Sequence, residues 1–153
     1  ALIKARTVHK ITGLPSLADD TGLEVDALDG APGVYSARFA GENPTFEDNV
    51  NKMLTALGGI PDDKRTARFR TALAFVDSNS ELCEEGVIEG KITEKPRGED
   101  GFGYDPIFEP ANKTKTFAEM ANEEKNRISH RARALEKMQI TLKHYFEKGV
   151  SID

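Results

Sequence analysis

The chain has 153 residues, of which 38% are apolar and 31% charged, and its formal net charge is −5. This length suits one domain, or two small lobes that share a sheet, and it can bury a real core. The acidic balance argues against a duplex-DNA binder, and no apolar stretch reaches the roughly 20 residues that a membrane helix needs. Because Cys83 is the only cysteine, an internal disulfide is excluded and the expected compartment is the cytoplasm.

The first predicted elements are a helix and two short strands. Residues 1–12 read as a helix, since the glycine that follows is a common helix terminator. Residues 14–18 then predict a short buried strand that stops at two adjacent aspartates, Asp19 and Asp20. Residues 23–28 alternate between apolar and polar side chains, which predicts a second strand.

The clearest helix begins at Thr45, after a glycine-containing loop over residues 29–43. The Thr45 hydroxyl can cap the free N–H groups of the first turn, and Asp48 stands at the reciprocal position of a capping box. The helix is predicted to bury one apolar stripe. The stripe consists of Phe46, Val50, Met53, Leu54 and Leu57.

A β-hairpin and a final helix complete the predicted fold. Residues 66–77 and 82–93 read as the two strands of the hairpin, and residues 96–110 form a loop rich in glycine and proline. The last helix is predicted to start at Ile128. Its buried side is expected to hold Ile128, Ala132, Leu135, Met138, Leu142, Tyr145 and Phe146. Helices interleaved with strands, together with an antiparallel hairpin, predict the α/β class with a mixed β-sheet.

The adjacent pair Asp19 and Asp20 has two interpretations. A carboxylate at a strand end suits Mg²⁺, which proteins hold through one or two carboxylates together with substrate phosphates and water. Alternatively, the pair helps to turn the chain into Thr21 and Gly22, as aspartate often does. Since neighbouring strand side chains point to opposite faces, at most one of the two carboxylates faces a given site.

The loop "GEDGFGYDP" over residues 98–106 is a candidate base-binding element. Glycines on either side of Phe102 let the backbone approach a ligand closely while the ring is held out. An aromatic ring in that setting can stack on a nucleobase, and Asp105 could accept hydrogen bonds from the base edge. The alternative is a turn in which Phe102 and Tyr104 fill the core.

A basic cluster lies at the start of the final helix. If Ser129 is the N-cap, Arg131 falls in the first turn, where the helix dipole disfavours a cation. A phosphate group or the acceptor edge of a purine would explain the cluster formed by Lys125, His130 and Arg131. The alternative is pairing with the neighbouring glutamates.

Three segments together resemble the signature blocks of the inosine triphosphate pyrophosphatase family. They are "ADDTGLEVDALDGAPGVYSARFAG", "GFGYDPIF" and "EEKNRISHRARAL", in this order. Members of that family hydrolyse ITP, dITP and XTP to the monophosphate and pyrophosphate, which cleanses the nucleotide pool. The resemblance covers nearly the whole chain. It implies one domain over residues 1–153, an elongated mixed sheet flanked by helices, two lobes with the nucleotide site in the cleft, and a homodimer.

The resemblance also implies roles for individual residues. Asp20 corresponds to the general base and Mg²⁺ contact, with Asp19 as a second candidate ligand of the metal. Thr21 matches a substrate-contacting hydroxyl, and Lys4 matches a lysine that reaches the triphosphate. The purine-binding loop corresponds to Phe102, Gly103, Tyr104 and Asp105, with Phe102 stacking on the base. The residues that favour a 6-oxo purine correspond to Lys125, His130 and Arg131.

The sequence departs from the family pattern at its start. The family begins with a strand and a "(S/T)GNxxK" phosphate loop, followed by a glutamate metal ligand, upstream of the segment that matches Ala1. We therefore expect a chain that lacks this N-terminal strand and phosphate-loop segment. Two alternatives stay open: another Mg²⁺-dependent nucleotide phosphohydrolase, or a non-catalytic nucleotide-binding protein if the segment is truly absent.

Overall fold

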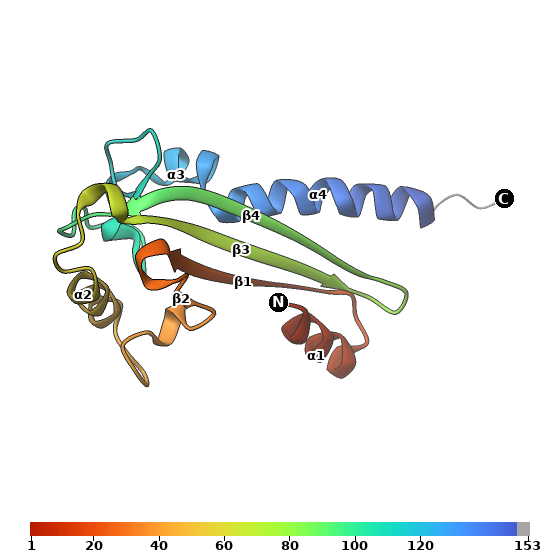
Figure 1. The fold of residues 1–153 in the computed structure, drawn as a ribbon. Helices are drawn as coiled ribbons and strands as arrows, with labels where there is room; N and C mark the ends of the chain where they lie inside the picture. The colour runs from red at the N-terminus through yellow and green to blue at the C-terminus, as the bar shows by residue number, and fades with distance from the viewer. Residues whose placement is uncertain (150–153) are drawn as a thin grey trace. The chain divides into compact units, whose positions relative to one another are not determined.

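The computed structural model describes residues 1–149. Its helices are α1 (Leu2–Thr12), α2 (Phe46–Ala56), α3 (Asn122–Ile128) and α4 (His130–Gly149). Its strands are β1 (Ser16–Val25), β2 (Pro32–Gly33), β3 (Thr66–Val76), β4 (Glu81–Ile92) and β5 (Phe108–Pro110). They form one sheet in the order β2-β1-β3-β4-β5, in which β1/β2 and β4/β5 are antiparallel (Figure 1). The predicted α/β class, with helices flanking the sheet and a β3–β4 hairpin, is confirmed.

The chain folds as two compact units, each with hydrophobic core residues of its own. Among the described residues, unit 1 comprises residues 1–20, 71–87 and 129–149. Unit 2 comprises residues 21–70 and 88–128. The boundaries fall inside β1, β3 and β4, so each of these strands supplies residues to both units.

In unit 1, the second half of β3 is buried on both faces. Leu73 and Phe75 pack against α4, whereas the alternate residues Ala74 and Val76 pack against α1. Because successive strand side chains point to opposite faces, the two helices cover opposite sides of this strand, as Figure 1 shows. This accounts for a continuous apolar run where a strand covered on one face would alternate.

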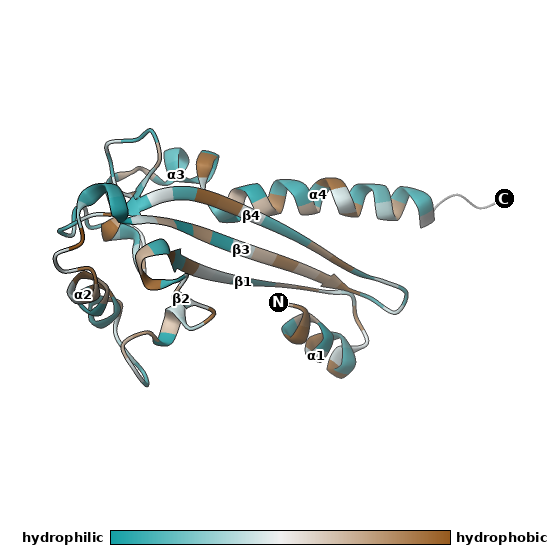
Figure 2. Cartoon of the chain, in the orientation of Figure 1, coloured by the Kyte–Doolittle hydropathy of each residue, from teal (hydrophilic) through white to brown (hydrophobic). Residues whose placement is uncertain are grey.

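Helix α4 differs from the predicted final helix in its start and in its buried side. Ser129 separates α3 from α4, and its Oγ accepts a hydrogen bond (3.1 Å) from a main-chain N–H of the first turn of α4. The residue is therefore the N-cap, as considered above. Leu135 and Phe146 are 48% and 51% exposed, and Ala134 is buried in place of Leu135. The predicted stripe was wrong there because it was anchored on Ile128, which belongs to α3. Figure 2 shows hydrophilic and hydrophobic residues alternating along α4.

The core of unit 2 is built around three aromatic rings. The Phe69 ring centroid lies 4.6 Å from that of Phe108 and 6.0 Å from that of Phe117. Helix α2 packs into the same core through Met53, and Leu57, directly after the helix, packs there too; both are fully buried. Tilted and offset ring pairs at these separations are favourable beyond the area that they bury.

The predicted start of α2 is confirmed, but its first apolar residue lies outside the core. Thr45 Oγ accepts a hydrogen bond from Asp48 N (3.0 Å), and the Asp48 carboxylate accepts one from Thr45 N (2.8 Å). This reciprocal capping box fixes the first turn. Phe46, predicted as the first member of the buried stripe, is instead 61% exposed.

Strand β1 runs without interruption through the aspartate pair. Asp19 and Asp20 are mid-strand residues, so the predicted strand end and the turn at Thr21 and Gly22 are both wrong. A Cβ at Gly22 would lie 2.6 Å from the main-chain oxygen of Gly33 on the paired strand β2. The glycine is therefore required for close approach of two backbones and makes no turn.

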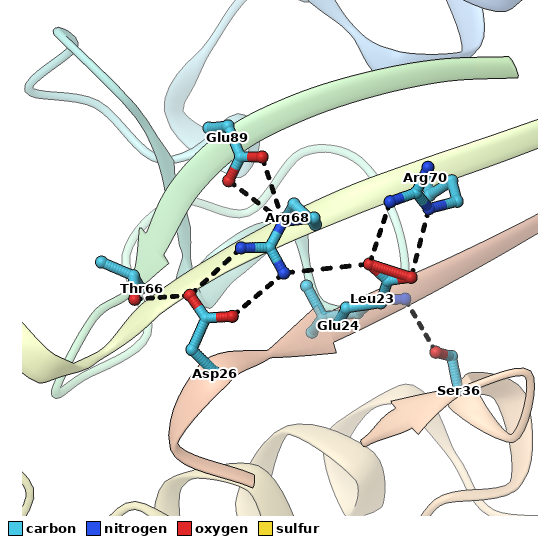
Figure 3. Close-up of polar contacts among 8 residues, drawn as sticks. All are labelled: Leu23, Glu24, Asp26, Ser36, Thr66, Arg68, Arg70 and Glu89. Carbon is cyan, nitrogen blue, oxygen red and sulfur yellow. Dashed lines mark hydrogen bonds and ion pairs between the residues drawn. The ribbon is translucent and has the colours of Figure 1, made fainter. Parts of the chain in front are cut away.

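The sheet surface of unit 2 carries a row of ion pairs (Figure 3). Arg68 of β3 lies between Asp26 and Glu89, with N–O distances of 3.0 Å to each carboxylate. Arg70 pairs with Glu24 of β1 at 3.1 Å. Opposite charges on adjacent strands stabilise the pairing of those strands. The hydrogen bond from Arg68 is the main reason that the pKa of Asp26 is lowered, and the bond from Thr66 adds to it.

Arg65 is buried at 3% exposure and is held by main-chain carbonyl groups. Its guanidinium donates to the carbonyl oxygens of Leu57 (2.8 Å), Ile92 (2.8 Å) and Thr93 (2.9 Å). The side chain thus supplies donors to carbonyl groups at the end of α2 and at the end of β4 in the interior.

Candidate functional site

The catalytic candidates of unit 1 are four charged side chains, joined as two ion pairs at successive residues of β1. Lys4 Nζ donates to the main-chain oxygen of Asp19 (3.0 Å) and to the Asp20 carboxylate (3.3 Å). Arg131 donates to the Asp19 carboxylate (3.2 Å). The structure therefore brings together four of the residues that the sequence singled out.

The strand geometry explains how these four residues are arranged. Asp19 and Asp20 are neighbours in β1, so their carboxylates point to opposite faces of the strand. One carboxylate meets a cation from α1, and the other meets a cation from the first turn of α4. All four side chains are between 42% and 60% exposed, and ion pairs so exposed contribute about 0–1 kcal/mol. A phosphate group can therefore replace a carboxylate of these pairs, and a metal ion can replace a cation, at little cost in free energy.

His130, the first residue of α4, is buried beside β4. A Cβ at Gly86 of β4 would lie 2.0 Å from the main-chain oxygen of His130, so only glycine allows the helix to approach so closely. The His130 side chain is 7% exposed. The helix start that carries His130 and Arg131 is therefore held firmly against the strand.

The base-binding candidates of unit 2 form a loop that holds one aromatic ring outward. Gly101 and Gly103 adopt φ angles of +78° and +60°, which favour glycine. Phe102 between them is 52% exposed. The Asp105 carboxylate, only 3% exposed as a residue, accepts hydrogen bonds from Phe102 N (3.0 Å) and from Lys125 Nζ (2.5 Å).

Lys125 holds the loop from the side of α3. Its ammonium group lies 4.9 Å from the centroid of the Phe102 ring, so it binds the ring face as well as the Asp105 carboxylate. The carboxylate partner of Lys125 is thus Asp105 from the loop, and the expected pairing with neighbouring glutamates was wrong for this lysine.

Tyr104 has the opposite environment from Phe102. It is 5% exposed, and its hydroxyl donates to the main-chain oxygen of Ser36 (2.6 Å). Burial raises the pKa of the Tyr104 phenol, so the hydroxyl stays a donor. Each alternative for the loop is therefore right for one ring: Tyr104 fills the core, and Phe102 is presented to solvent.

Two contributors to the site were missed from the sequence. Ser36 supports Tyr104, and its own Oγ accepts a hydrogen bond from Leu23 N (2.8 Å). Phe46 lies beside Phe102, with 6.4 Å between their ring centroids. Neither carried a local signal, because both contacts join segments far apart in the chain. Thr21 directly follows Asp20 in β1 and is partly buried.

Asp20 is the carboxylate that would hold a magnesium ion with few other protein ligands. Residues 1–149 include no group of three or more histidine, cysteine or carboxylate side chains that could cage a metal. Mg²⁺ is commonly held through one or two carboxylates, with substrate phosphates and water supplying the rest. Asp20, half-exposed, can supply such a ligand, with Asp19 as a second candidate on the opposite face.

Solved structures establish the class of the fold. The chain is similar to the Ham1 protein of Staphylococcus aureus, with 39% identity and a TM-score of 0.90, covering 95% of this chain and 75% of that one. It is also similar to a HAM1 protein from Coxiella burnetii, with 46% identity and a TM-score of 0.88 over 94% of this chain and 75% of that one. The fold is that of the Ham1 class of α/β proteins.

The chain belongs to the Ham1 family, whose profile matches residues 1–141. A relative in Thermoanaerobacter pseudethanolicus, named dITP/XTP pyrophosphatase, is 54% identical over 149 residues. That alignment covers 97% of this chain and 73% of the relative. The family resemblance stated from the three sequence segments is confirmed.

Proposed function

We propose that this chain is a Mg²⁺-dependent pyrophosphatase of non-standard purine nucleoside triphosphates, acting on dITP, ITP and XTP. The proposal is supported by the activity in the names of its relatives, such as the dITP/XTP pyrophosphatase of Thermoanaerobacter pseudethanolicus. The observation that carries it is the exposed ion pair between Lys4 Nζ and the Asp20 carboxylate, with an N–O distance of 3.3 Å. In such a pair the lysine can bind an anionic substrate, and the carboxylate can accept a proton from the water that attacks it.

In the proposed reaction, a water molecule attacks the α-phosphorus while the Asp20 carboxylate accepts its proton. The bond between the α-phosphorus and the oxygen that bridges to the β-phosphate breaks, and its electron pair leaves with pyrophosphate. Lys4 donates hydrogen bonds to phosphate oxygens in place of the Asp20 contact seen here. When bound, Mg²⁺ would offset the negative charge of the phosphates.

As in the family that the sequence resembles, stacking on the base is assigned to Phe102, and the preference for a 6-oxo purine to His130 and Arg131. Phe102 stacks on the purine, while Lys125 and Asp105 hold its loop. His130 and Arg131 supply donors for a C6 carbonyl, the acceptor of hypoxanthine and xanthine. Adenine carries an amino donor at that position, so a donor-lined site would leave it unpaired and reject it.

The catalytic assignment is tested with Asp20→Asn, which keeps the side-chain shape and removes the charge. We expect kcat for ITP to fall by about 10²- to 10⁴-fold, the usual contribution of a general base, with a smaller change in KM. Asp63→Asn, at an exposed position of unit 2, is the matched control and should keep full activity. Turnover by Asp20→Asn close to that of the unchanged chain would refute the role of Asp20.

The specificity assignment is tested with Arg131→Ala. We expect a higher KM for ITP and a smaller gap between ITP and ATP in kcat/KM. Arg127→Ala, an exposed arginine of α3, is the control and should leave the ratio unchanged. An unchanged ITP/ATP ratio in Arg131→Ala would count against the assignment.

Two further expectations accompany the proposed activity: the protein acts as a homodimer, and it works in the cytoplasm. Sedimentation velocity of the purified protein tests the first expectation directly. In the part of the chain that the structure describes, no helix is both long and apolar enough to cross a membrane.

A further inference from the structure

Phe46 is a large apolar side chain that the fold does not use. The other members of its predicted stripe pack into the core of unit 2, whereas Phe46 is 61% exposed. Its ring lies 6.4 Å from the exposed ring of Phe102, at an interplanar angle of 45°. Two exposed aromatic rings therefore stand side by side on the surface of unit 2.

The backbone at both residues is held in place by its surroundings. Phe46 is the first residue of α2, directly after the Thr45–Asp48 capping box, so its backbone is fixed. Phe102 is fixed by the Asp105 carboxylate at its N–H and by the Lys125 ammonium over its ring. A pre-positioned pair of this kind loses little conformational entropy when a flat ligand binds.

We propose that Phe46 is a second base-contacting residue, which together with Phe102 forms a two-ring surface for a purine. The inference rests on the proposed function, in which Phe102 stacks on the base. A bicyclic purine stacked on one phenyl ring extends past its edge, so its second ring can contact the neighbouring tilted ring of Phe46, 6.4 Å away. A pyrimidine is a single ring and gains little from it. Phe46 therefore favours purines over pyrimidines that present the same carbonyl and N–H edge.

The test compares the binding of inosine monophosphate and uridine monophosphate by calorimetry. Both bases present a carbonyl next to a ring N–H, so they differ mainly in ring number. Partial contact with a tilted ring is weaker than full stacking of a base on an aromatic side chain, so the expected loss for Phe46→Ala is about fivefold in the Kd of inosine monophosphate. The Kd of uridine monophosphate should change by less than about twofold, because a base that does not reach Phe46 loses no stacking on it. Phe46→Tyr, which keeps an aromatic ring, should keep the affinity that Phe46→Ala loses for inosine monophosphate. Glu47→Ala, at an exposed neighbouring position on α2, is the matched control.

Phe102→Ala separates failure of this inference from failure of the proposed function. If Phe102→Ala weakens the binding of inosine monophosphate and Phe46→Ala does not, Phe46 is no part of the base site and the proposed function stands. Equal losses of both nucleotides in Phe46→Ala would also overturn the inference. If neither variant weakens binding, the proposed base site is wrong as well.

A fluorescence readout tests the same contact without loss of the ring. The chain has no tryptophan, so Phe46→Trp introduces a single tryptophan beside Phe102, which can be excited selectively over the three tyrosines. Inosine monophosphate should change its emission, whereas inorganic pyrophosphate, which has no base, should not. Thr55→Trp, near the other end of α2, is the control. An emission unchanged by inosine monophosphate would contradict contact between Phe46 and the base.

Discussion

Replacing Asp105 with alanine removes the group that holds the exposed ring of Phe102. The carboxylate side chain is 5% exposed and its partner Lys125 is 15% exposed, with 2.5 Å between the charged atoms. Removing one member of a buried pair costs about 3–5 kcal/mol, and the partial exposure of Lys125 places this case near about 3 kcal/mol. The Phe102 N–H also loses its acceptor, which adds about 1 kcal/mol.

Thermal and urea unfolding measure the effect. At about 2–4 °C per kcal/mol for a chain of this size, Asp105→Ala should lower the Tm by about 8–16 °C. The double variant Asp105→Ala, Lys125→Met leaves no unpaired charge, so it should be more stable than Asp105→Ala, and the coupling free energy in the cycle should be about 2 kcal/mol. A Tm shift below about 2 °C, or a coupling within the usual error of about 0.5 kcal/mol, would refute this account of the loop.

Three further predictions concern stability and are checked by urea unfolding. Arg65→Lys should lower the free energy of unfolding by about 2 kcal/mol or more, because an ammonium group cannot donate to the same set of carbonyls. An unchanged urea midpoint would contradict this. Ser129→Ala should cost about 1 kcal/mol and Ser129→Gly only a few tenths, as for other N-caps, and equal losses would argue against capping. The pKa of Asp26 is lower in the folded chain than its unfolded value near 3.8, so the ionised carboxylate stabilises the fold at pH values above 3.8. This stabilisation is lost as the pH falls through the folded pKa of Asp26. Arg68→Met should therefore cost about 0.5–1 kcal/mol at pH 7, with a smaller difference near pH 2, and a difference that grows on acidification would contradict the pairing.

Local signals in the sequence were sufficient for several elements. The capping box at Thr45 and Asp48 marked the start of α2, and the two strand-like segments over residues 66–77 and 82–93, joined by a short turn, marked the hairpin. These features depend on residues within a few positions of one another. The course of β1 could not be predicted in the same way, because Gly22 is required by the backbone of β2 and therefore mimicked a turn signal.

The candidate site was predictable by residue type and much less by contact. The resemblance identified Lys4, Asp20 and Arg131, but the pairing of Arg131 with Asp19 joins two residues that are 112 positions apart in the chain. The exposure of Phe46 had no local cause either, since helical periodicity placed it on the buried side. Side-chain environments set by such distant neighbours become visible only in the folded chain.

Incubation with ITP and Mg²⁺, with ATP in parallel, followed by chromatography of the products, tests the proposed activity most directly. We predict IMP and pyrophosphate from ITP, little product from ATP, and loss of both products in Asp20→Asn. IDP and orthophosphate as the products, or the same turnover from ATP as from ITP, would contradict the proposed reaction and its specificity.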